Sequence, residues 1–450
     1  MGFFGDARLT LNVTDSAGGK NVTGKNMRPK LFDVRANDVS NEGVPVIKPW
    51  KRIVIDPDYA GAWIIAGDVD GDDHVEIVSA KNVDKNDSHY TSSVVVHRLD
   101  GSVLWRWGNP SAGRNELHHD VGCQIYDWDG DGQNEVVVAA REAIVELDGA
   151  TGNEKRRFAI PKDASDCIVF ANLSGSQLAR DILVKTRYGQ IWAYDYDGKL
   201  LWTIKEPAGY RTAHQPRPLD IDHDGKDEIM AGYAMLNSDG TVRWDLRDCG
   251  LSLGRGHLDC ARLFRKGQTP EDSRIVVTLC GDHCIAMLDG NGRLLWSHAH
   301  AGHHFESIDV GRVCPDIPGK QIVVDIDDRP WGQSPTWILS EDGEWLGQIV
   351  ADRSRQHLTL GWDGSGLESI VIAQTRAMFD GSGKKIATFD LPWGTQKIAI
   401  QSYKGDMTGD GIPDLLFHTI PVKEVFLFKN EKGRKVPDAQ LGTGKNFTLY

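Results

Sequence analysis

Short apolar runs recur along the chain, and each follows a turn built from acidic residues and glycine. The clearest copies are GDVDGDDHVEIVSA (67–80), QIYDWDGDGQNEVVVA (124–139) and LDIDHDGKDEIMAG (219–232), and GDMTGDGIPDLLFH (405–418) is a weaker one. The runs are rich in valine and isoleucine and show no helical spacing, which is typical of buried strands. The pattern therefore predicts pairs of strands joined by acidic turns.

The copies repeat at a regular interval. The anchors Asp127, Asp220, Asp309 and Asp406 are 93, 89 and 97 residues apart, and a weaker copy lies near the middle of each interval. ANLSGSQLARDILV and LGWDGSGLESIVIA, for example, keep the turn and the apolar run but have lost most of the acids. The period is therefore about 47 residues, within the range of units that repeat around a ring.

Each unit carries a second mark, an Asp-Gly turn between apolar positions that is usually followed by tryptophan. HRLDGSVLWRW, YDYDGKLLWTI and LNSDGTVRWDL show it. Such a turn predicts a hairpin, which brings each unit to four strands. We predict an all-β fold, an eight-bladed β-propeller from near Trp63 to near Phe428. A seven-bladed ring is the alternative, if the first copy only completes the last blade.

The division of the chain follows from the repeats. Residues 51–450 are predicted to form a single propeller domain. Residues 1–50, rich in glycine, asparagine and lysine, are predicted to be an N-terminal arm or a segment that closes the ring.

The acidic turns follow the pattern D-x-D-G-D-G-x-x-[DE], in which alternate carboxylates converge on one point. Such a cluster repels itself unless a cation is bound, and Ca²⁺ prefers oxygen ligands of this kind. Without a cation, the same residues would only favour a turn. We predict structural calcium ions with ligands from four turns: Asp68, Asp70, Asp72 and Glu76; Asp127, Asp129, Asp131 and Glu135; Asp220, Asp222, Asp224 and Glu228; Asp406, Asp410 and Asp414.

Composition excludes several classes of partner. The chain has 51 Lys and Arg against 64 Asp and Glu, a net charge of −13, which argues against nucleic acid and anionic membranes. No stretch is long and apolar enough to span a membrane. No secretory signal is visible, which predicts a cytoplasmic protein, or a secreted or periplasmic one if a signal has been removed. Seven cysteines do not suggest a disulfide scaffold.

Histidines and arginines gather where the innermost strand of each unit is predicted to begin. A single histidine at such a position is more often structural, but five units have a histidine at an equivalent position. Together the side chains would make one end of the ring cationic and favour an anionic ligand. The predicted set contains His118, His119, Arg211, His214, Arg255, His257, His303, His304, Arg353, Arg355 and His357.

Two further stretches offer chemistry. In DILVKTRYGQIWAYD, Lys185, Arg187 and Tyr188 begin a hairpin after the third inner strand, although Tyr188 could instead pack between blades. In TLCGDHC, Cys280, His283 and Cys284 could hold a zinc ion, with soft ligands but a spacing unlike standard zinc motifs.

The chain resembles the catalytic propeller of rhamnogalacturonan lyases, to which ulvan lyases and rhamnose–glucuronate lyases are related. The resemblance runs over roughly residues 60–270. It rests, in order, on GDVDGDDHVEIV, KNDSHYTSS, HRLDGSVLWRW, HHDVGCQIYDWDGDGQNEV, AHQPRPLDIDHDGKDEIMAG and GRGHLDCARLF. It implies a calcium-bearing ring that cleaves a rhamnose–uronate type of polysaccharide or oligosaccharide by β-elimination. EVVVAAREAIVELDG lacks the longer polar loop of those enzymes, which leaves the substrate open.

β-Elimination at a uronate needs a cation for the carboxylate, a base for the C5 proton and an acid for the leaving O4. Arg211, or else Arg187, is predicted to bind the carboxylate, His119 or His214 to act as base, and Tyr188 or His257 as acid.

Two rival functions remain open. A hydrolase acting on a rhamnosyl–glucuronate bond would use acidic residues such as Glu116, Asp120 and Glu306. A non-catalytic propeller of the integrin-like kind, binding carbohydrate or protein, would carry similar calcium loops but would need no histidines at the ring centre.

Overall fold

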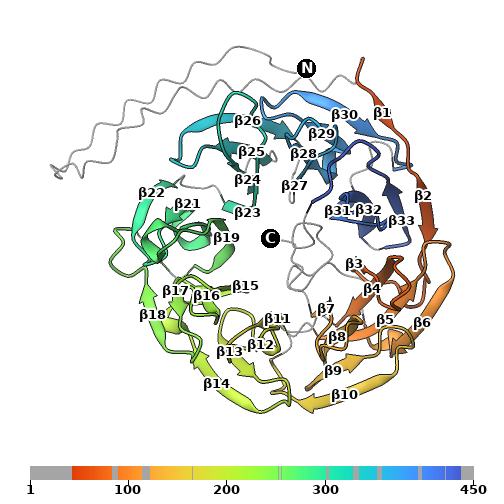
Figure 1. Cartoon of the computed structure of the whole chain (residues 1–450), viewed down its shortest axis with the longest axis horizontal. Helices are drawn as coiled ribbons and strands as arrows, with labels where there is room; N and C mark the ends of the chain where they lie inside the picture. The colour runs from red at the N-terminus through yellow and green to blue at the C-terminus, as the bar shows by residue number, and fades with distance from the viewer. Residues whose placement is uncertain are drawn as a thin grey trace, which may run out of the picture.

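Eight sheets stand side by side around a common centre and form a closed ring (Figure 1). The computed structural model describes residues 43–83, 90–113, 122–164, 166–251, 253–254, 256–299, 304–327, 334–351, 357–393, 398–420 and 422–436. Within these residues the chain is all-β, which confirms the predicted eight-bladed propeller. The described residues contain five 3-10 turns, and none of these has the length and hydropathy of a membrane-crossing helix.

The first four blades follow one another in chain order, each with its innermost strand first. Blade 1 contains β3 (Trp63–Gly67), β4 (Glu76–Asn82), β5 (Thr91–His97) and β6 (Val103–Gly108). Blade 2 contains β7 (Cys123–Tyr126), β8 (Glu135–Ala140), β9 (Ala143–Leu147) and β10 (Glu154–Ala159). Blade 3 contains β11 (Ile168–Ala171), β12 (Asp181–Lys185), β13 (Gln190–Tyr194) and β14 (Leu200–Lys205). Blade 4 contains β15 (Thr212–Leu219), β16 (Glu228–Gly232), β17 (Ala234–Leu236) and β18 (Val242–Asp245).

Blades 5 and 6 keep this order, and the last two borrow strands from the start of the chain. Blade 5 contains β19 (Leu258–Arg265), β20 (Arg274–Leu279), β21 (Cys284–Leu288) and β22 (Leu294–Ala299). Blade 6 contains β23 (His304–Gly311), β24 (Gln321–Asp327), β25 (Ser334–Leu339) and β26 (Trp345–Ala351). Blade 7 contains β27 (His357–Leu360), β28 (Ser369–Ile372), β29 (Ala377–Phe379), β30 (Lys385–Phe389) and β1 (Val46–Ile47). Blade 8 contains β31 (Ala399–Gly405), β32 (Asp414–Ile420), β33 (Glu424–Phe428) and β2 (Lys51–Val54). The 3-10 turns are η1 (Pro110–Ala112), η2 (Pro207–Gly209), η3 (Pro270–Asp272), η4 (Cys280–Asp282) and η5 (Ala373–Thr375).

The ring is closed by the N-terminal side of the described chain. β2 pairs antiparallel with β33 and becomes the outermost strand of blade 8, and β1 pairs parallel with β30 at the rim of blade 7 (Figure 1). Residues that are far apart in sequence, such as Ile53 and Val425, are thereby joined by main-chain hydrogen bonds. This closure ties the first described strands to the last, so the ring cannot open without breaking a sheet.

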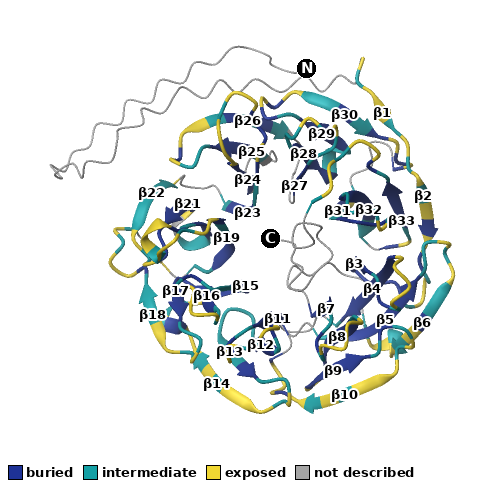
Figure 2. Cartoon of the chain, viewed as in Figure 1, coloured by how far each residue is buried: buried dark blue, intermediate teal, exposed yellow. Residues whose placement is uncertain are grey.

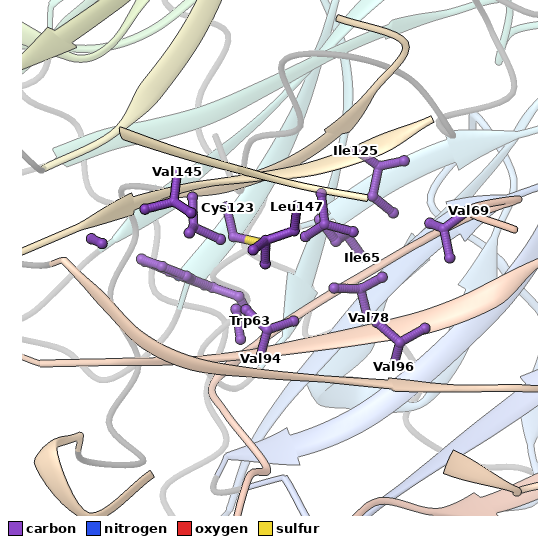
Figure 3. Packing of buried hydrophobic residues seen from close by; sticks show 14 of the residues in the cluster. Trp63, Ile65, Val69, Val78, Val94, Val96, Cys123, Ile125, Val145 and Leu147 are labelled. Carbon is purple, nitrogen blue, oxygen red and sulfur yellow. The ribbon is translucent and has the colours of Figure 1, made fainter. Parts of the chain in front are cut away.

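Most inner strands are apolar at nearly every position because both faces of a blade are covered by its neighbours. In β3, Trp63 and Ile65 point to blade 2, and Ile64 and Ala66 point to blade 8. Figure 3 shows the first of these interfaces, where Trp63 and Ile65 meet Cys123, Ile125, Val145 and Leu147. Successive side chains of a strand leave on opposite faces. A doubly covered strand therefore has an apolar run instead of apolar and polar alternation, and exposed side chains are concentrated at the rim (Figure 2).

At four blade junctions, the tryptophan that follows the hairpin turn has a specific partner in the next blade. Trp202 lies on Gly240, whose φ of 83° and closeness to the ring leave no room for a side chain. The indole N–H of Trp202 also donates to Ser238 O at 2.9 Å. The same contact recurs at three other junctions, between Trp105 and Gly152, Trp244 and Gly292, and Trp296 and Gly343. The Asp-Gly-x-x-x-Trp pattern thus encodes contact between blades as well as hairpins.

One end of the ring carries the acidic turns and the other the predicted chemistry. The turns after β3, β7, β15 and β31 lie where the innermost strands end. We call the opposite end, where innermost strands begin and second strands end, the site end. Tyr188, His214, His257 and His304 all belong to it, because each lies at the start of an innermost strand or in a turn after a second strand.

A buried histidine in blade 8 makes stability depend on pH. His418 in β32 is 3% exposed, and burial, opposed by its contact with Thr419 O, lowers its pKa to about 4. Between about pH 4 and the ordinary histidine pKa near 6.5, the unfolded chain therefore binds more protons than the folded chain. Stability should therefore fall as pH falls through this window, by about 3 kcal/mol in total from His418.

We expect the free energy of unfolding of His418→Asn, measured with urea, to fall less between pH 7 and pH 4 than that of wild type. His283→Asn, which changes an exposed histidine, is the control and should show the same pH dependence of stability as wild type. An identical pH dependence in wild type and His418→Asn would contradict the assignment.

Candidate functional site

Tyr188 is the centre of a group of rings at the site end. Its hydroxyl forms a 2.8 Å hydrogen bond with Nε2 of His214, from β15 of blade 4. Its ring stacks on His257 of blade 5, with centroids 4.0 Å apart and planes 26° apart. His214 is buried, whereas Tyr188 is only half-buried. Tyr188 and His257 are therefore the partly exposed rings of this group, and His214 is the buried one.

Asp259 joins the histidines of blades 4, 5 and 6. Its Oδ1 lies 2.9 Å from His257 Nε2 and 3.6 Å from His214 Nε2, and its Oδ2 lies 3.0 Å from His304 Nε2. Nδ1 of His304 in turn lies 3.2 Å from Glu306 Oε1. The Asp259 side chain is fully buried, so it positions the three imidazoles and is not itself accessible to a ligand.

Cys280, in η4 after β20, belongs to the same group. Burial opposes ionisation of its thiol, but hydrogen bonds with His257 and His304 outweigh burial and lower the pKa of Cys280 to about 6. Burial also opposes the charged imidazoles, yet Asp259 and Cys280 raise the pKa of His257 to about 9 and that of His304 to about 11. The two imidazolium charges are therefore balanced by the thiolate and the Asp259 carboxylate.

Two arginines lie beside Tyr188 at the site end. Arg187 donates from Nη2 to the Tyr188 hydroxyl at 3.2 Å, and its guanidinium lies 5.1 Å from the Tyr188 ring. Arg211 is exposed, with its guanidinium 5.9 Å from the same ring. Two guanidinium groups next to a hydroxyl suit a ligand that carries a carboxylate and sugar hydroxyls.

A buried ion pair supports the turn that carries Tyr188. Lys185, the last residue of β12, pairs with Asp166, and both side chains are fully buried. The Lys185 ammonium also donates to Thr186 O at 3.2 Å. Tyr188 itself has a φ of 62°, in the left-handed region that non-glycine residues rarely occupy. The ion pair and the main-chain bonds of this turn hold Tyr188 in that conformation.

Comparisons with known proteins agree with the fold. The family described as Rhamnogalacturonan lyase family 11, C-terminal domain, matches residues 44–160. Rhamnogalacturonan endolyase YesW of Bacillus subtilis (strain 168) is 26% identical over 366 residues, 66% of this chain and 55% of YesW. The chain is a rhamnogalacturonan lyase-like β-propeller.

Two other comparisons bear on this rhamnogalacturonan lyase-like propeller. Rhamnogalacturonan exolyase YesX of the same organism is 25% identical over 409 residues, 71% of this chain and 61% of YesX. The crystal structure of YesW superposes with a TM-score of 0.58 at 20% identity, over 90% of this chain and 80% of that one. The chain thus spans somewhat more than half the length of these curated relatives.

The rhamnogalacturonan lyase-like propeller brings some of the predicted site residues together. Arg187, Tyr188, His214, His257 and His304 form one group, with Arg211 at its edge. His357 is buried in blade 7 and contacts Val323 O at 2.9 Å and Asp325 at 3.5 Å. The predictions for His118, His119, Arg255, His303, Arg353 and Arg355, and for Glu116 and Asp120, concern residues outside the described part of the chain.

Asp259 was not identified as a site residue from the sequence. Cys280 was named only as a possible zinc ligand and not as a neighbour of the site histidines. A signal for Asp259 was available, because His257 and Asp259 are two residues apart at the start of a strand, as are His304 and Glu306. Positions i and i+2 of a strand face the same side. For Cys280 no such signal existed, since its neighbours come from other strands.

The predicted metal sites fit the structure to different degrees. Ligand atoms of Asp68, Asp70 and Glu76 in blade 1 lie within 4.8 Å of one another. Burial, together with the charges of Asp70 and Asp72, raises the pKa of Glu76 to about 7 despite a backbone hydrogen bond from Val69. This turn has the convergent oxygens that calcium needs. Ligand atoms of Asp127, Asp129 and Asp131 in blade 2 also lie within 4.8 Å of one another. In blade 8, the turn with Asp406 and Asp410 ends at Asp414, where burial raises the pKa to about 6.

Two groups that could hold a metal ion, with histidine and cysteine among their members, lie at the site end. One group combines His214, His257 and Asp259, and another combines Asp259, Cys280 and His304, each with ligand atoms within 4.8 Å. Cys284 is fully buried in β21, and His283 is exposed in the left-handed turn before it. Zinc at Cys280, His283 and Cys284 stays a prediction, and the structure also places Cys280 with Asp259 and His304.

Proposed function

We propose that this propeller is a polysaccharide lyase that cleaves a uronate-containing polysaccharide or oligosaccharide of the rhamnose–uronate type by β-elimination. The observation that carries the proposal is the meeting of the Tyr188 hydroxyl with His214 and with the guanidinium groups of Arg187 and Arg211. The names of the relatives YesW and YesX, both rhamnogalacturonan lyases, support the same reaction.

In the proposed reaction the uronate carboxylate binds Arg187 and Arg211, which stabilise the negative charge that develops as C5 loses its proton. Tyr188 oxygen takes that proton, after its own proton has moved to His214 Nε2 across the 2.8 Å hydrogen bond. The C4–O4 bond breaks, a C4–C5 double bond forms, and O4 leaves with a proton. His257, stacked on Tyr188, is the proposed donor of that proton.

This assignment differs from the one based on sequence in the role of His214. The sequence offered His119 or His214 as the base that meets the sugar, and Tyr188 or His257 as the acid. Because His214 is 3% exposed and Tyr188 lies in front of it, we assign contact with C5 to Tyr188 and the role of proton partner to His214. The second sequence candidate for the base, His119, lies outside the described residues.

The reaction class can be tested without knowing the natural substrate. The chain is incubated with rhamnogalacturonan, an ulvan-type polysaccharide and an acidic gum, and the ultraviolet absorbance of the unsaturated uronate is followed. We expect absorbance to rise with at least one of them. New reducing ends without absorbance would show hydrolysis, and binding without any product would show a non-catalytic propeller. Either result would overturn the proposal.

A further inference from the structure

The outermost strand of seven blades contains a bulge at the same place. In blades 1 to 7 the register between the third and fourth strands skips one residue just after the Asp-Gly turn. In five blades the skipped residue is aliphatic: Leu104, Leu201, Leu295, Leu346 and Ile386. Four of these, all except Leu201, pack against a core cluster. Bulges redirect the side chain of the extra residue.

Blades 2 and 4 have a basic residue at this bulge, Lys155 and Arg243. In blade 2 the Lys155 ammonium pairs with Asp129 and lies 2.8 Å from Glu135 Oε1 and 3.5 Å from Asp131 Oδ2. In blade 4 the Arg243 guanidinium lies 2.7 Å from Asp222 Oδ2 and 3.2 Å from Glu228 Oε1. Each bulge cation therefore reaches the acidic turn of its own blade.

The two cations contact the same positions of the two turns. Asp129 and Asp222 are the third residues of the pattern D-x-D-G-D-G-x-x-[DE], and Glu135 and Glu228 are the ninth. The closing glutamates are almost fully buried, with side chains 2% and 3% exposed. A buried carboxylate needs a cation within contact distance, and a lysine or arginine supplied by the chain meets that need as a metal ion would.

Calcium and a bulge cation cannot share one turn. Calcium binds 6–8 oxygens at about 2.3–2.6 Å, and the carboxylates it would use in blade 2 already face the Lys155 ammonium. A divalent ion at those oxygens would be in close contact with a positive charge and would be repelled. The bulge cation would have to leave before the ion could bind.

Blade 1 supplies the comparison within the same chain. Its turn has the full set Asp68, Asp70, Asp72 and Glu76, but its bulge residue is Leu104. Arg98 reaches only Asp70 Oδ2, at 2.9 Å, and Asp70 Oδ1 is buried and accepts no hydrogen bond. The three turns are nearly the same in sequence and differ in the residue at the bulge; in blade 4, Lys266 Nζ also lies 3.2 Å from Asp220 Oδ2.

We propose that Lys155 and Arg243 are built-in counter-cations that take the place of calcium in the acidic turns of blades 2 and 4. Calcium is then confined to turns without a bulge cation, such as that of blade 1. This departs from the sequence-based prediction, which assigned calcium to all these turns alike. It does not depend on the proposed lyase activity, because the acidic turns lie at the opposite end of the ring from Tyr188.

Counting bound ions tests the proposal. The full chain is stripped with EDTA and dialysed against CaCl₂, and bound calcium is measured by atomic emission. Asp131→Asn and Asp224→Asn change the fifth position of the turns in blades 2 and 4, and we expect both to bind as many ions as wild type. Asp72→Asn, the matched change in blade 1, should bind one ion fewer. Loss of an ion in Asp131→Asn or Asp224→Asn would overturn the proposal.

Removing the bulge cation gives the converse test. Lys155→Met keeps the aliphatic part of the side chain, and Leu104→Met is the matched bulge variant of blade 1. We expect Lys155→Met to bind one ion more than wild type, and its Tm to become dependent on calcium, while Leu104→Met gains neither property. A Lys155→Met chain that folds but gains no ion would overturn the proposal. If that variant does not fold at any calcium concentration, the ion count of Asp131→Asn decides.

Discussion

Replacing Tyr188 by phenylalanine is expected to lower kcat by about 10²–10⁴-fold, the usual contribution of a positioned acid or base. The change removes only the hydroxyl, which bonds to His214 at 2.8 Å and accepts from Arg187 at 3.2 Å. The ring and its stacking on His257 are kept. Stability should therefore be little affected, and KM should change less than kcat, because Arg187 and Arg211 remain to bind the carboxylate. Initial rates of unsaturated uronate formation measure both constants.

Tyr196→Phe is the matched control, since Tyr196 is also half-buried in blade 3 and its hydroxyl donates to Glu146 away from the site end. It should keep the wild-type rate. His214→Gln should resemble Tyr188→Phe, because an amide cannot take up the proton of Tyr188 as an imidazole does. Wild-type turnover in Tyr188→Phe would show that Tyr188 oxygen does not take part in proton transfer.

Replacing Lys185 by methionine should destabilise the protein by about 3–5 kcal/mol, the typical cost of removing one partner of a buried ion pair. Lys185 and Asp166 are both fully buried, and methionine leaves the Asp166 carboxylate without the ammonium that faces it. Activity should fall as well, since Lys185 donates to Thr186 O in the turn that holds Tyr188. Urea unfolding gives the change in free energy, and the rate at a temperature where the variant is folded gives the effect on the site.

An exposed ion pair is the control that separates the effect of burial on stability from the effect of charge. Arg265 lies 2.8 Å from Glu341, with side chains 46% and 39% exposed. Arg265→Met should cost only about 0–1 kcal/mol. The double change of Lys185→Met and Asp166→Leu should regain much of the lost stability, because it removes the uncompensated charge, but should not restore activity. A cost below about 1 kcal/mol for Lys185→Met would mean that the pair is not a buried support of the turn.

The charges of the site end explain why arginine, more than histidine, is expected to recognise the substrate. His257 and His304 are held in their charged forms by Asp259 and by the Cys280 thiolate, so their charges are compensated within the protein. The guanidinium groups of Arg187 and Arg211 lie 5.1 Å and 5.9 Å from the Tyr188 ring. A ring of net charge −13 can therefore still offer a local cationic surface to a uronate.

The residues of the site were partly visible in the sequence. Tyr188, His214 and His257 could be chosen because the repeat frame shows where each innermost strand begins, and that position decides which residues reach one end of the ring. Their contacts could not be predicted. Tyr188 belongs to blade 3, His214 to blade 4 and His257 to blade 5, and their separation depends on how far each blade is rotated from the next. Asp259 was missed although His257 lies two residues before it; its other two partners, His214 and His304, belong to two other strands.

The sequence by itself determined the fold of this protein: the period of about 47 residues, the acidic turns and the Asp-Gly-x-x-x-Trp hairpins specify four-stranded units, and eight of them make the ring. These are local signals, since turn chemistry and apolar runs act within a few residues. Only the tertiary structure decided which acidic turns already have a cation and which ring nitrogens share one carboxylate. Lys155 follows Asp131 by 24 residues and His304 follows Asp259 by 45. Such pairs meet only when bulges and neighbouring blades bring distant side chains within reach.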